Sequence, residues 1–122
     1  MAKNILVVED NDHLRQILAS FIRFSGYDVL EAESGSEAIE KAALAKPDLI
    51  LLDLTLPDLN GIDVARAIKE NVVTADIPII ACSAYASGEE REEALRAGIV
   101  DYLEKPIAAA LIKAKIEEFI LP

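Results

Sequence analysis

The stretch from residue 48 to residue 57 constrains the fold most, because it places four consecutive apolar residues directly before Asp53. A short apolar run without alternation predicts a strand that is buried on both faces, as in a parallel sheet covered by helices. Asp53 would then lie at the carboxyl end of a central strand, where open α/β sheets bind ligands. The stretch alone leaves three interpretations open for this carboxylate: a nucleophile, a metal ligand, or a structural acid that caps a helix or lies in a turn.

Length and charge exclude several classes of protein. With 122 residues the chain is expected to form one domain. Its net charge of −10 argues against direct binding to nucleic acids or to an anionic membrane surface. No apolar run approaches the roughly 20 residues that span a bilayer, and the N-terminus has no secretory signal pattern. The single cysteine, Cys82, fits a reducing compartment, so we expect the protein to be cytoplasmic.

Strand-like and helix-like patterns alternate five times along the chain. The expected strands cover residues 5–8, 27–32, 49–53, 77–82 and 101–103, and a helix follows each. The first helix is amphipathic, whereas the fourth has few large apolar residues. This alternation predicts an α/β protein with a doubly wound, five-stranded parallel sheet in the flavodoxin-like order 2-1-3-4-5. In that order the first and third strands are neighbours. The acids that follow them, Glu9, Asp10 and Asp53, should therefore meet at one edge of the sheet.

Several local features lead to narrower expectations. Ser87 and Glu90 have the spacing of a capping box for the fourth helix. We expect Cys82 to be a small buried hydrophobic residue and His13 to be a surface residue. The three phenylalanines are expected to pack in the core: Phe21, Phe24 and Phe119.

A group of polar side chains falls at the predicted carboxyl ends of the strands. The carboxylates of Glu9, Asp10 and Asp53 would repel one another unless a cation joined them, and oxygen ligands suit Mg²⁺ or Mn²⁺. Ser83 offers a hydroxyl donor, and Lys105 offers a mobile positive charge. Such a set can neutralise the oxygens of a phosphoryl group in transfer, while a carboxylate acts as the nucleophile and forms an aspartyl phosphate.

These residues carry a family resemblance that extends over residues 1–122. The sequence resembles the receiver domain of two-component response regulators, and especially the single-domain, chemotaxis-regulator-like members. The matching positions are Glu9-Asp10, Asp53, Pro57, Gly61, Ser83-Ala84, Tyr102 and Lys105-Pro106.

The resemblance implies a role for each matched residue. Asp53 would be the phosphoacceptor, supplied by a histidine kinase or a phosphotransfer protein, and the Lys105-Pro106 peptide bond would be cis. The remaining implied roles are Mg²⁺ binding by Glu9, Asp10, Asp53 and the Thr55 carbonyl, phosphate contacts from Ser83, Ala84 and Lys105, and switching by Ser83 and Tyr102.

The resemblance also implies how the signal is read. Phosphorylation would change the surface of the fourth helix, the fifth strand and the fifth helix, which would bind a downstream target protein. The fifth helix lacks the arginine pattern of receivers that pair through this face, so we expect a monomer or a weak dimer. Thr55 and Tyr85 occupy positions that tune the approach of water to the phosphoryl group, and the bulk of Tyr85 predicts slow dephosphorylation.

Alternative functions fit less well. An aspartyl-phosphate phosphatase of the haloacid-dehalogenase kind needs a second acid two residues after Asp53, and that position is Thr55. Neither glycine-rich nucleotide-binding motif occurs. We therefore expect a signalling domain that catalyses only its own phosphorylation and dephosphorylation. The chain is either a stand-alone regulator or a receiver domain from a hybrid histidine kinase or a larger regulator.

Overall fold

The computed structural model describes residues 2–84 and 87–120, and in this part of the chain five strands alternate with five helices. The strands form one parallel sheet in the order β2-β1-β3-β4-β5, so the predicted fold is confirmed. The elements are β1 (Asn4–Val8), α1 (Asp12–Phe24), β2 (Asp28–Ala32), α2 (Gly35–Ala45), β3 (Leu49–Asp53), α3 (Gly61–Glu70), β4 (Ile79–Ser83), α4 (Gly88–Arg96), β5 (Asp101–Glu104) and α5 (Ala109–Phe119).

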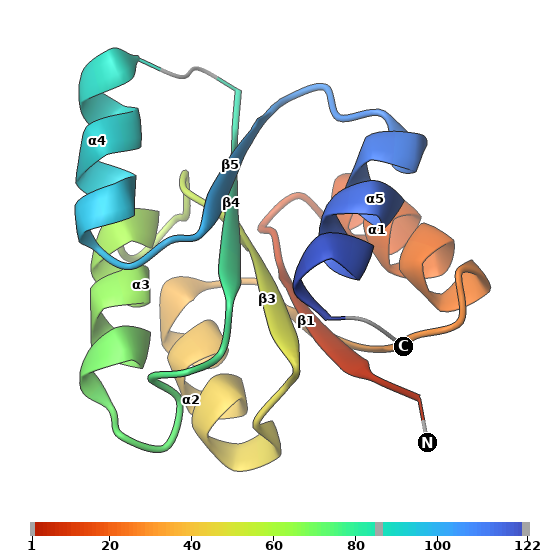
Figure 1. Cartoon of the computed structure of the whole chain (residues 1–122), viewed down its shortest axis with the longest axis horizontal. Coiled ribbons are helices and arrows are strands. Elements are labelled where there is room, and N and C mark those ends of the chain that lie inside the picture. The colour runs from red at the N-terminus through yellow and green to blue at the C-terminus, as the bar shows by residue number, and fades with distance from the viewer. Residues whose placement is uncertain (1, 85–86, 121–122) are drawn as a thin grey trace.

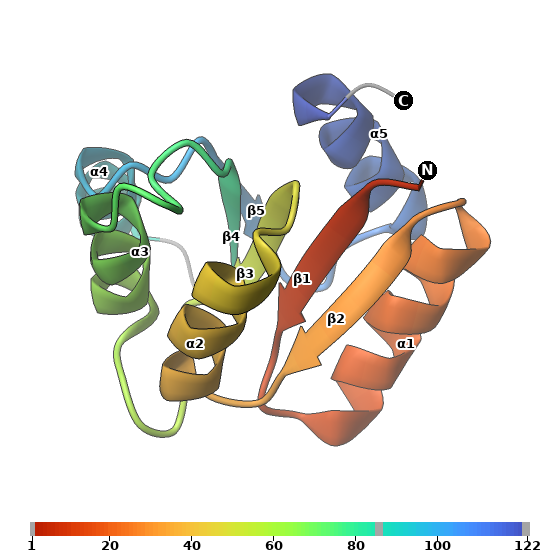
Figure 2. The ribbon, with the colours of Figure 1, turned by 90° about the horizontal axis from the view of Figure 1, so that it is seen from below.

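Helices cover both faces of the sheet (Figures 1 and 2). Helices α1 and α5 lie on one face, and α2, α3 and α4 lie on the other. Successive strand residues point to opposite faces, so Ile5 packs in one core and Leu6 in the other. Every residue of β3 is buried, which explains its unbroken apolar run. Among the described residues, no helix has the length and apolar character needed to cross a membrane.

Side-chain caps set where four of the helices begin. The cap residues precede α1, α2, α3 and α4, and each side-chain oxygen accepts a hydrogen bond from a backbone N–H in the first turn. The cap residues are Asn11, Ser34, Asn60 and Ser87. Gly61 follows one of these caps at a point of close approach, because a Cβ there would lie 2.5 Å from the Leu54 Cα. This contact fixes the loop that follows Asp53.

One of the expected core phenylalanines is a surface residue. Phe21 and Phe119 pack against the core between the sheet and helices α1 and α5, whereas Phe24 is 91% exposed. The helical period explains the difference, because Phe24 lies two positions after the buried Ile22, which is about 200° around the helix. His13 is exposed and Cys82 is buried, as predicted.

Asp58 ties the loop after β3 to the start of α2. Its carboxylate accepts hydrogen bonds from the backbone N–H groups of Gly35, at 2.8 Å, and Ser36, at 3.0 Å, and from the Ser36 hydroxyl, at 2.9 Å. The two backbone hydrogen bonds lower the pKa of Asp58 to about 2. A negative charge at the N-terminus of a helix is also favourable for the helix dipole.

This arrangement predicts an acid-dependent loss of stability. The folded-state pKa of Asp58 lies below its unfolded value, so its contribution is complete above about pH 4 and is lost as the pH falls through about 2. We expect Asp58→Asn to lower the melting temperature at pH 7 and to have a much smaller effect near pH 2. Thermal unfolding followed by circular dichroism tests this, with Asp28→Asn as the exposed control. Equal melting temperatures for Asp58→Asn and wild type at pH 7 would contradict it.

Candidate functional site

The carboxyl ends of β1 and β3 bring three carboxylates together. Val8 pairs with Leu52, so Glu9 and Asp53 follow at the same edge of the sheet. One carboxylate oxygen from each of Glu9, Asp10 and Asp53 lies within 4.8 Å of the other two. Glu9 and Asp53 are buried, whereas Asp10 is exposed. The structure thus places these acids side by side, as the predicted strand order requires.

Lys105 is the residue that directly follows β5, and its side chain extends into the same cluster. Its Nζ lies 2.7 Å from Glu9 Oε1 and 3.4 Å from Asp53 Oδ1. Burial acts to lower the pKa of Lys105, but the hydrogen bond to Glu9 and the charge of Asp53 outweigh burial, so the pKa is raised. The ammonium group therefore stays charged and offsets the repulsion between the carboxylates. The Lys105-Pro106 peptide bond is cis.

The cluster opens to solvent through a cleft of about 350 Å³. Thr55 and Ala84 lie on its wall, and the Thr55 backbone N–H donates to Asp53 Oδ1 at 3.1 Å. An open cleft with three carboxylates is a donor set that suits a hard divalent cation such as Mg²⁺. The lining residues are Glu9, Asp10, Asn11, Leu14, Asp53, Thr55, Ala84 and Lys105.

Ser83 and Tyr102 form a chain of contacts from the end of β4 to helix α4. Ser83 is the buried last residue of β4, and Tyr102 belongs to β5. The Tyr102 hydroxyl donates to Glu90 Oε1 on α4, and the guanidinium carbon of Arg91 lies 4.9 Å from the ring centre. Burial and the Glu90 hydrogen bond raise the pKa of Tyr102 to about 12, while a hydrogen bond with Ser83 acts in the opposite direction. Tyr102 therefore connects Ser83, at the end of β4, to α4.

Glu90 differs in part from its predicted role. Ser87 Oγ accepts from the Glu90 backbone N–H at 3.0 Å, as a capping box requires, but the Glu90 side chain accepts from Tyr102. Tyr85, which was predicted to slow dephosphorylation, lies outside the described residues. Burial raises the pKa of the Cys82 thiol to about 12, which fits an unreactive core residue.

The sequence patterns did not single out Arg15, which is buried next to the cluster. Its Nη1 donates to the backbone carbonyl of Glu9 at 2.9 Å. A signal was present, because Arg15 shares the buried stripe of α1 with Leu18, Ala19 and Ile22. A charged residue at a core-facing helical position needs partners, and several acids lie nearby in the sequence.

Comparison with known proteins gives a consistent result. The family model of the response regulator receiver domain matches residues 5–117. The phosphate regulon transcriptional regulatory protein PhoB of Pseudomonas aeruginosa is 37% identical over 96% of this chain and 51% of its own length. The polar-differentiation response regulator DivK of Brucella ovis is 32% identical over 98% of both chains. The chain thus spans about half the length of PhoB and nearly all of DivK.

A solved structure shares both the fold and part of the sequence. It is the receiver domain of the sensor histidine kinase PA1611 from Pseudomonas aeruginosa PAO1, with a magnesium ion coordinated in its active site cleft. The TM-score is 0.90, the sequence identity is 34%, and the alignment covers 98% of each chain.

Proposed function

Because this chain belongs to the response regulator receiver domain family, we propose that it is a phosphorylation-activated switch in which Asp53 accepts the phosphoryl group. One observation carries the assignment of the residue. Asp53 is a buried carboxylate at the end of the central strand, 3.4 Å from the Lys105 ammonium, in an open cleft. A histidine kinase or a phosphotransfer protein would be the donor, as in a two-component phosphorelay.

The proposed transfer is a displacement at phosphorus. An Asp53 oxygen attacks the phosphorus of a donor phosphohistidine, and the new P–O bond forms as the P–N bond breaks. The bonding electron pair returns to the imidazole nitrogen, which then takes up a proton. The Lys105 ammonium, 3.4 Å from Asp53 Oδ1, would bind the oxygens of the transferred group, and the small Ala84 on the cleft wall would leave room for it. We propose that the Ser83 hydroxyl, at the end of β4, binds the same oxygens.

Mg²⁺ fits the donor set of this cleft. We propose the carboxylates of Glu9, Asp10 and Asp53 and the backbone carbonyl of Thr55 as its ligands. Once bound, the ion would offset the negative charge of the phosphoryl oxygens, and Mn²⁺ suits the same oxygen ligands. The magnesium ion in the PA1611 receiver domain, whose fold this chain shares, supports the choice of metal.

The proposed activity is signalling rather than turnover of a separate substrate. The position two residues after Asp53 is Thr55, so the general acid of an aspartyl-phosphate phosphatase is not found there. We extend the receiver domain to residues 1–122, because α5 packs onto the same sheet as β1. The cytoplasm is the proposed location, and a stand-alone regulator and a receiver within a larger regulator or hybrid kinase both fit.

The first test is labelling of Asp53. Incubation with acetyl phosphate and Mg²⁺ should add one phosphoryl group, and Asp53→Asn should take up none at that residue. We expect Lys105→Ala to be labelled, but its phosphorylated form should change conformation less than phosphorylated wild type. The reason is that Lys105 is the only described cation within 4 Å of both buried carboxylates. Mass spectrometry locates the group, with Lys113→Ala as the surface control. A phosphate mapped to another residue would contradict the assignment.

We further propose that the surface of α4, β5 and α5 reads the signal. Phosphorylation would add about one negative charge and several acceptor oxygens at Asp53, which would attract the Ser83 hydroxyl. Ser83 would then give up its hydrogen bond to Tyr102, and the Tyr102 side chain could leave Glu90. An equilibrium between two packings of α4 would thereby be shifted.

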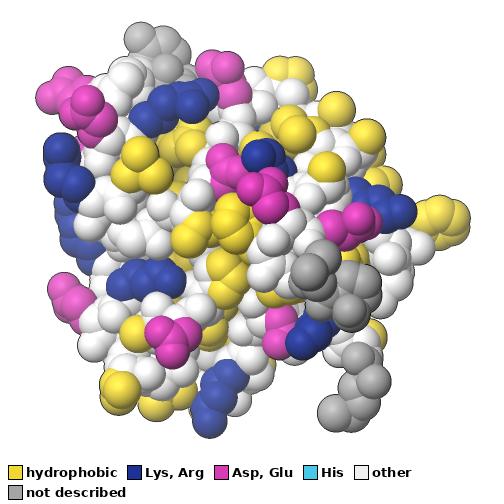
Figure 3. Space-filling view, in the orientation of Figure 1, with side chains coloured by type: hydrophobic (Ala, Val, Ile, Leu, Met, Phe, Trp, Pro, Cys, Tyr) yellow, Lys and Arg dark blue, Asp and Glu magenta, His cyan; other side chains and the backbone are white. Residues whose placement is uncertain are grey.

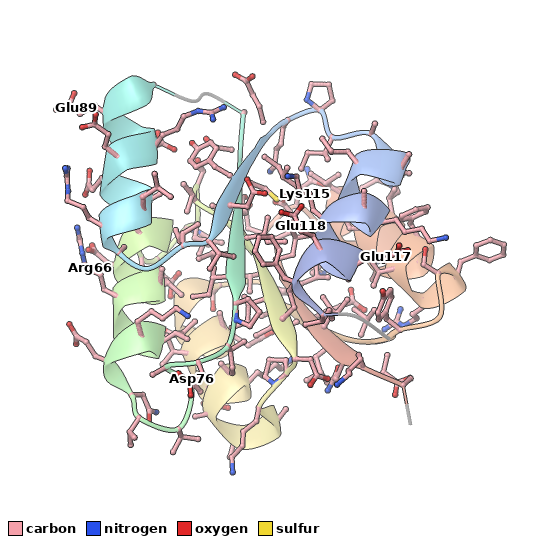
Figure 4. The ribbon with its side chains drawn as sticks, viewed as in Figure 1. Arg66, Asp76, Glu89, Lys115, Glu117 and Glu118 are labelled. Carbon is pink, nitrogen blue, oxygen red and sulfur yellow. The ribbon has the colours of Figure 1, made fainter. Side chains whose placement is uncertain are left out.

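This output surface combines apolar and charged side chains (Figure 3). Its large exposed apolar residues are Leu95, Val100 and Leu111. Lys115 pairs with Asp101 at 2.9 Å. It also pairs at 3.3 Å with Glu118, which lies beside it on α5 (Figure 4). Because this lysine already has partners within its own chain, we propose a monomer or weak dimer that binds a different protein.

The connection through Tyr102 can be tested without knowing the target. Phosphorylation of the wild type should shift the amide resonances of α4 and β5. In Tyr102→Ala, Asp53 should be labelled to the same extent, but the shifts in α4 should be at most about half as large. NMR measures both, with Tyr27→Phe as the control. Undiminished α4 shifts in Tyr102→Ala, or a tight phosphorylated dimer in sedimentation, would contradict these proposals.

A further inference from the structure

Arg15 is a buried cation that the proposed phosphoryl transfer does not use. Its side chain is only 8% exposed, although it lies in the first turn and a half of α1. A buried guanidinium group is stable only when its N–H groups have partners. Every partner is anionic or a carbonyl: Glu9 O at 2.9 Å, Asp12 Oδ1 at 2.6 Å, Glu33 Oε1 at 3.2 Å and Glu31 Oε1 at 3.3 Å.

These contacts come from three separate parts of the fold. Asp12 begins α1, Glu31 lies in the edge strand β2, and Glu33 follows that strand. The hydrogen bond to Asp12 is the main cause of the raised pKa of Arg15, and burial acts against it. The guanidinium group thus joins α1 and β2 to the end of β1, where the acidic cluster begins.

Glu9 is held at all of its polar groups. Its backbone N–H donates to Ala32 O at 3.0 Å, and its Oε1 and Oε2 accept from Lys105 Nζ and the Asn11 backbone N–H. Arg15 holds the remaining group, the backbone carbonyl. That carbonyl belongs to the peptide between Glu9 and Asp10. Because a peptide group is planar, holding its oxygen also fixes the direction in which Asp10 leaves the strand.

We propose that Arg15 is a positioning residue for the cation site formed by Glu9, Asp10 and Asp53. It acts through the peptide between Glu9 and Asp10, so the affinity for a divalent cation depends on the ion pairs between α1 and β2. This inference rests on the proposed function, since it assumes that the cluster binds Mg²⁺. Loss of groups that orient metal ligands typically weakens metal binding by about 10–100-fold.

Removing the Arg15 side chain should change the affinity for a divalent cation in opposite directions, depending on whether Arg15 acts through its charge or through its position. Removing a positive charge near three carboxylates would strengthen cation binding if charge alone mattered. Removing a positioning residue weakens binding. Arg23 provides the matched control, because it lies on the same helix and pairs with Glu31 at 3.3 Å, but it is half exposed and does not contact Glu9.

The experiment is calorimetric titration of the full chain with MgCl₂ alone, after circular dichroism has shown which variants are folded. Arg15→Ala should bind Mg²⁺ about tenfold more weakly than wild type. Arg23→Ala should stay within about twofold of wild type. Arg15→Lys is the second variant. It keeps the positive charge, and it takes the place of Arg15→Ala in the titration if Arg15→Ala does not fold. It should also bind more weakly, because one ammonium group cannot replace the guanidinium fork.

The outcomes separate this inference from the proposed function. If wild type binds Mg²⁺ but the folded Arg15 variants bind it equally well or more tightly, Arg15 has no positioning role and the proposed function stands. If wild type binds no Mg²⁺, the metal site and this inference both fail. As a second readout, excess Mg²⁺ should restore acetyl phosphate labelling of the Arg15 variants, which a damaged nucleophile would not allow.

Discussion

The interaction between Lys105 and the carboxylates of Glu9 and Asp53 is the one on which the rest of the site depends. Both carboxylates are nearly inaccessible to solvent, and two buried like charges at neighbouring strand ends would repel each other. Breaking a buried ion pair by removing one partner typically costs about 3–5 kcal/mol. The sheet order makes this compensation possible, because Lys105 follows β5 at the same edge as the ends of β1 and β3.

The same arrangement suits a switch as well as a stable core. Lys105, which retains some exposure, offsets part of the negative charge of the cluster, and the cleft opens to solvent, so a charge added at Asp53 would be accessible to water and to a cation. Ser83 and Tyr102 extend from this edge to α4, where Glu90 and Arg91 hold the tyrosine ring. A change of charge at one strand end therefore has a short path to an outer helix.

The sequence predicts the fold and the acidic cluster because both follow from the order of strands and helices along the chain. Strand periodicity and the acids after the first and third strands are enough to place Glu9 beside Asp53. The prediction for Phe24 was wrong because residue type was given more weight than helical period. Arg15 was not singled out, although it lies on the core-facing side of the first helix, because the sequence patterns considered only apolar residues there. The bond between Glu90 and Tyr102 depends on how α4 sits on β5, which capping patterns do not determine.

A crystal structure with Mg²⁺ and beryllofluoride, a stable mimic of the phosphoryl group, is the most direct test of the central role of Asp53. The proposed function predicts beryllium bonded to an Asp53 oxygen, with the Lys105 ammonium within hydrogen-bonding distance of a fluorine. It also predicts the metal among Glu9, Asp10 and Asp53. Beryllofluoride bound at another residue, or an unmodified Asp53 with Lys105 still paired to Glu9 at saturating beryllofluoride, would contradict it.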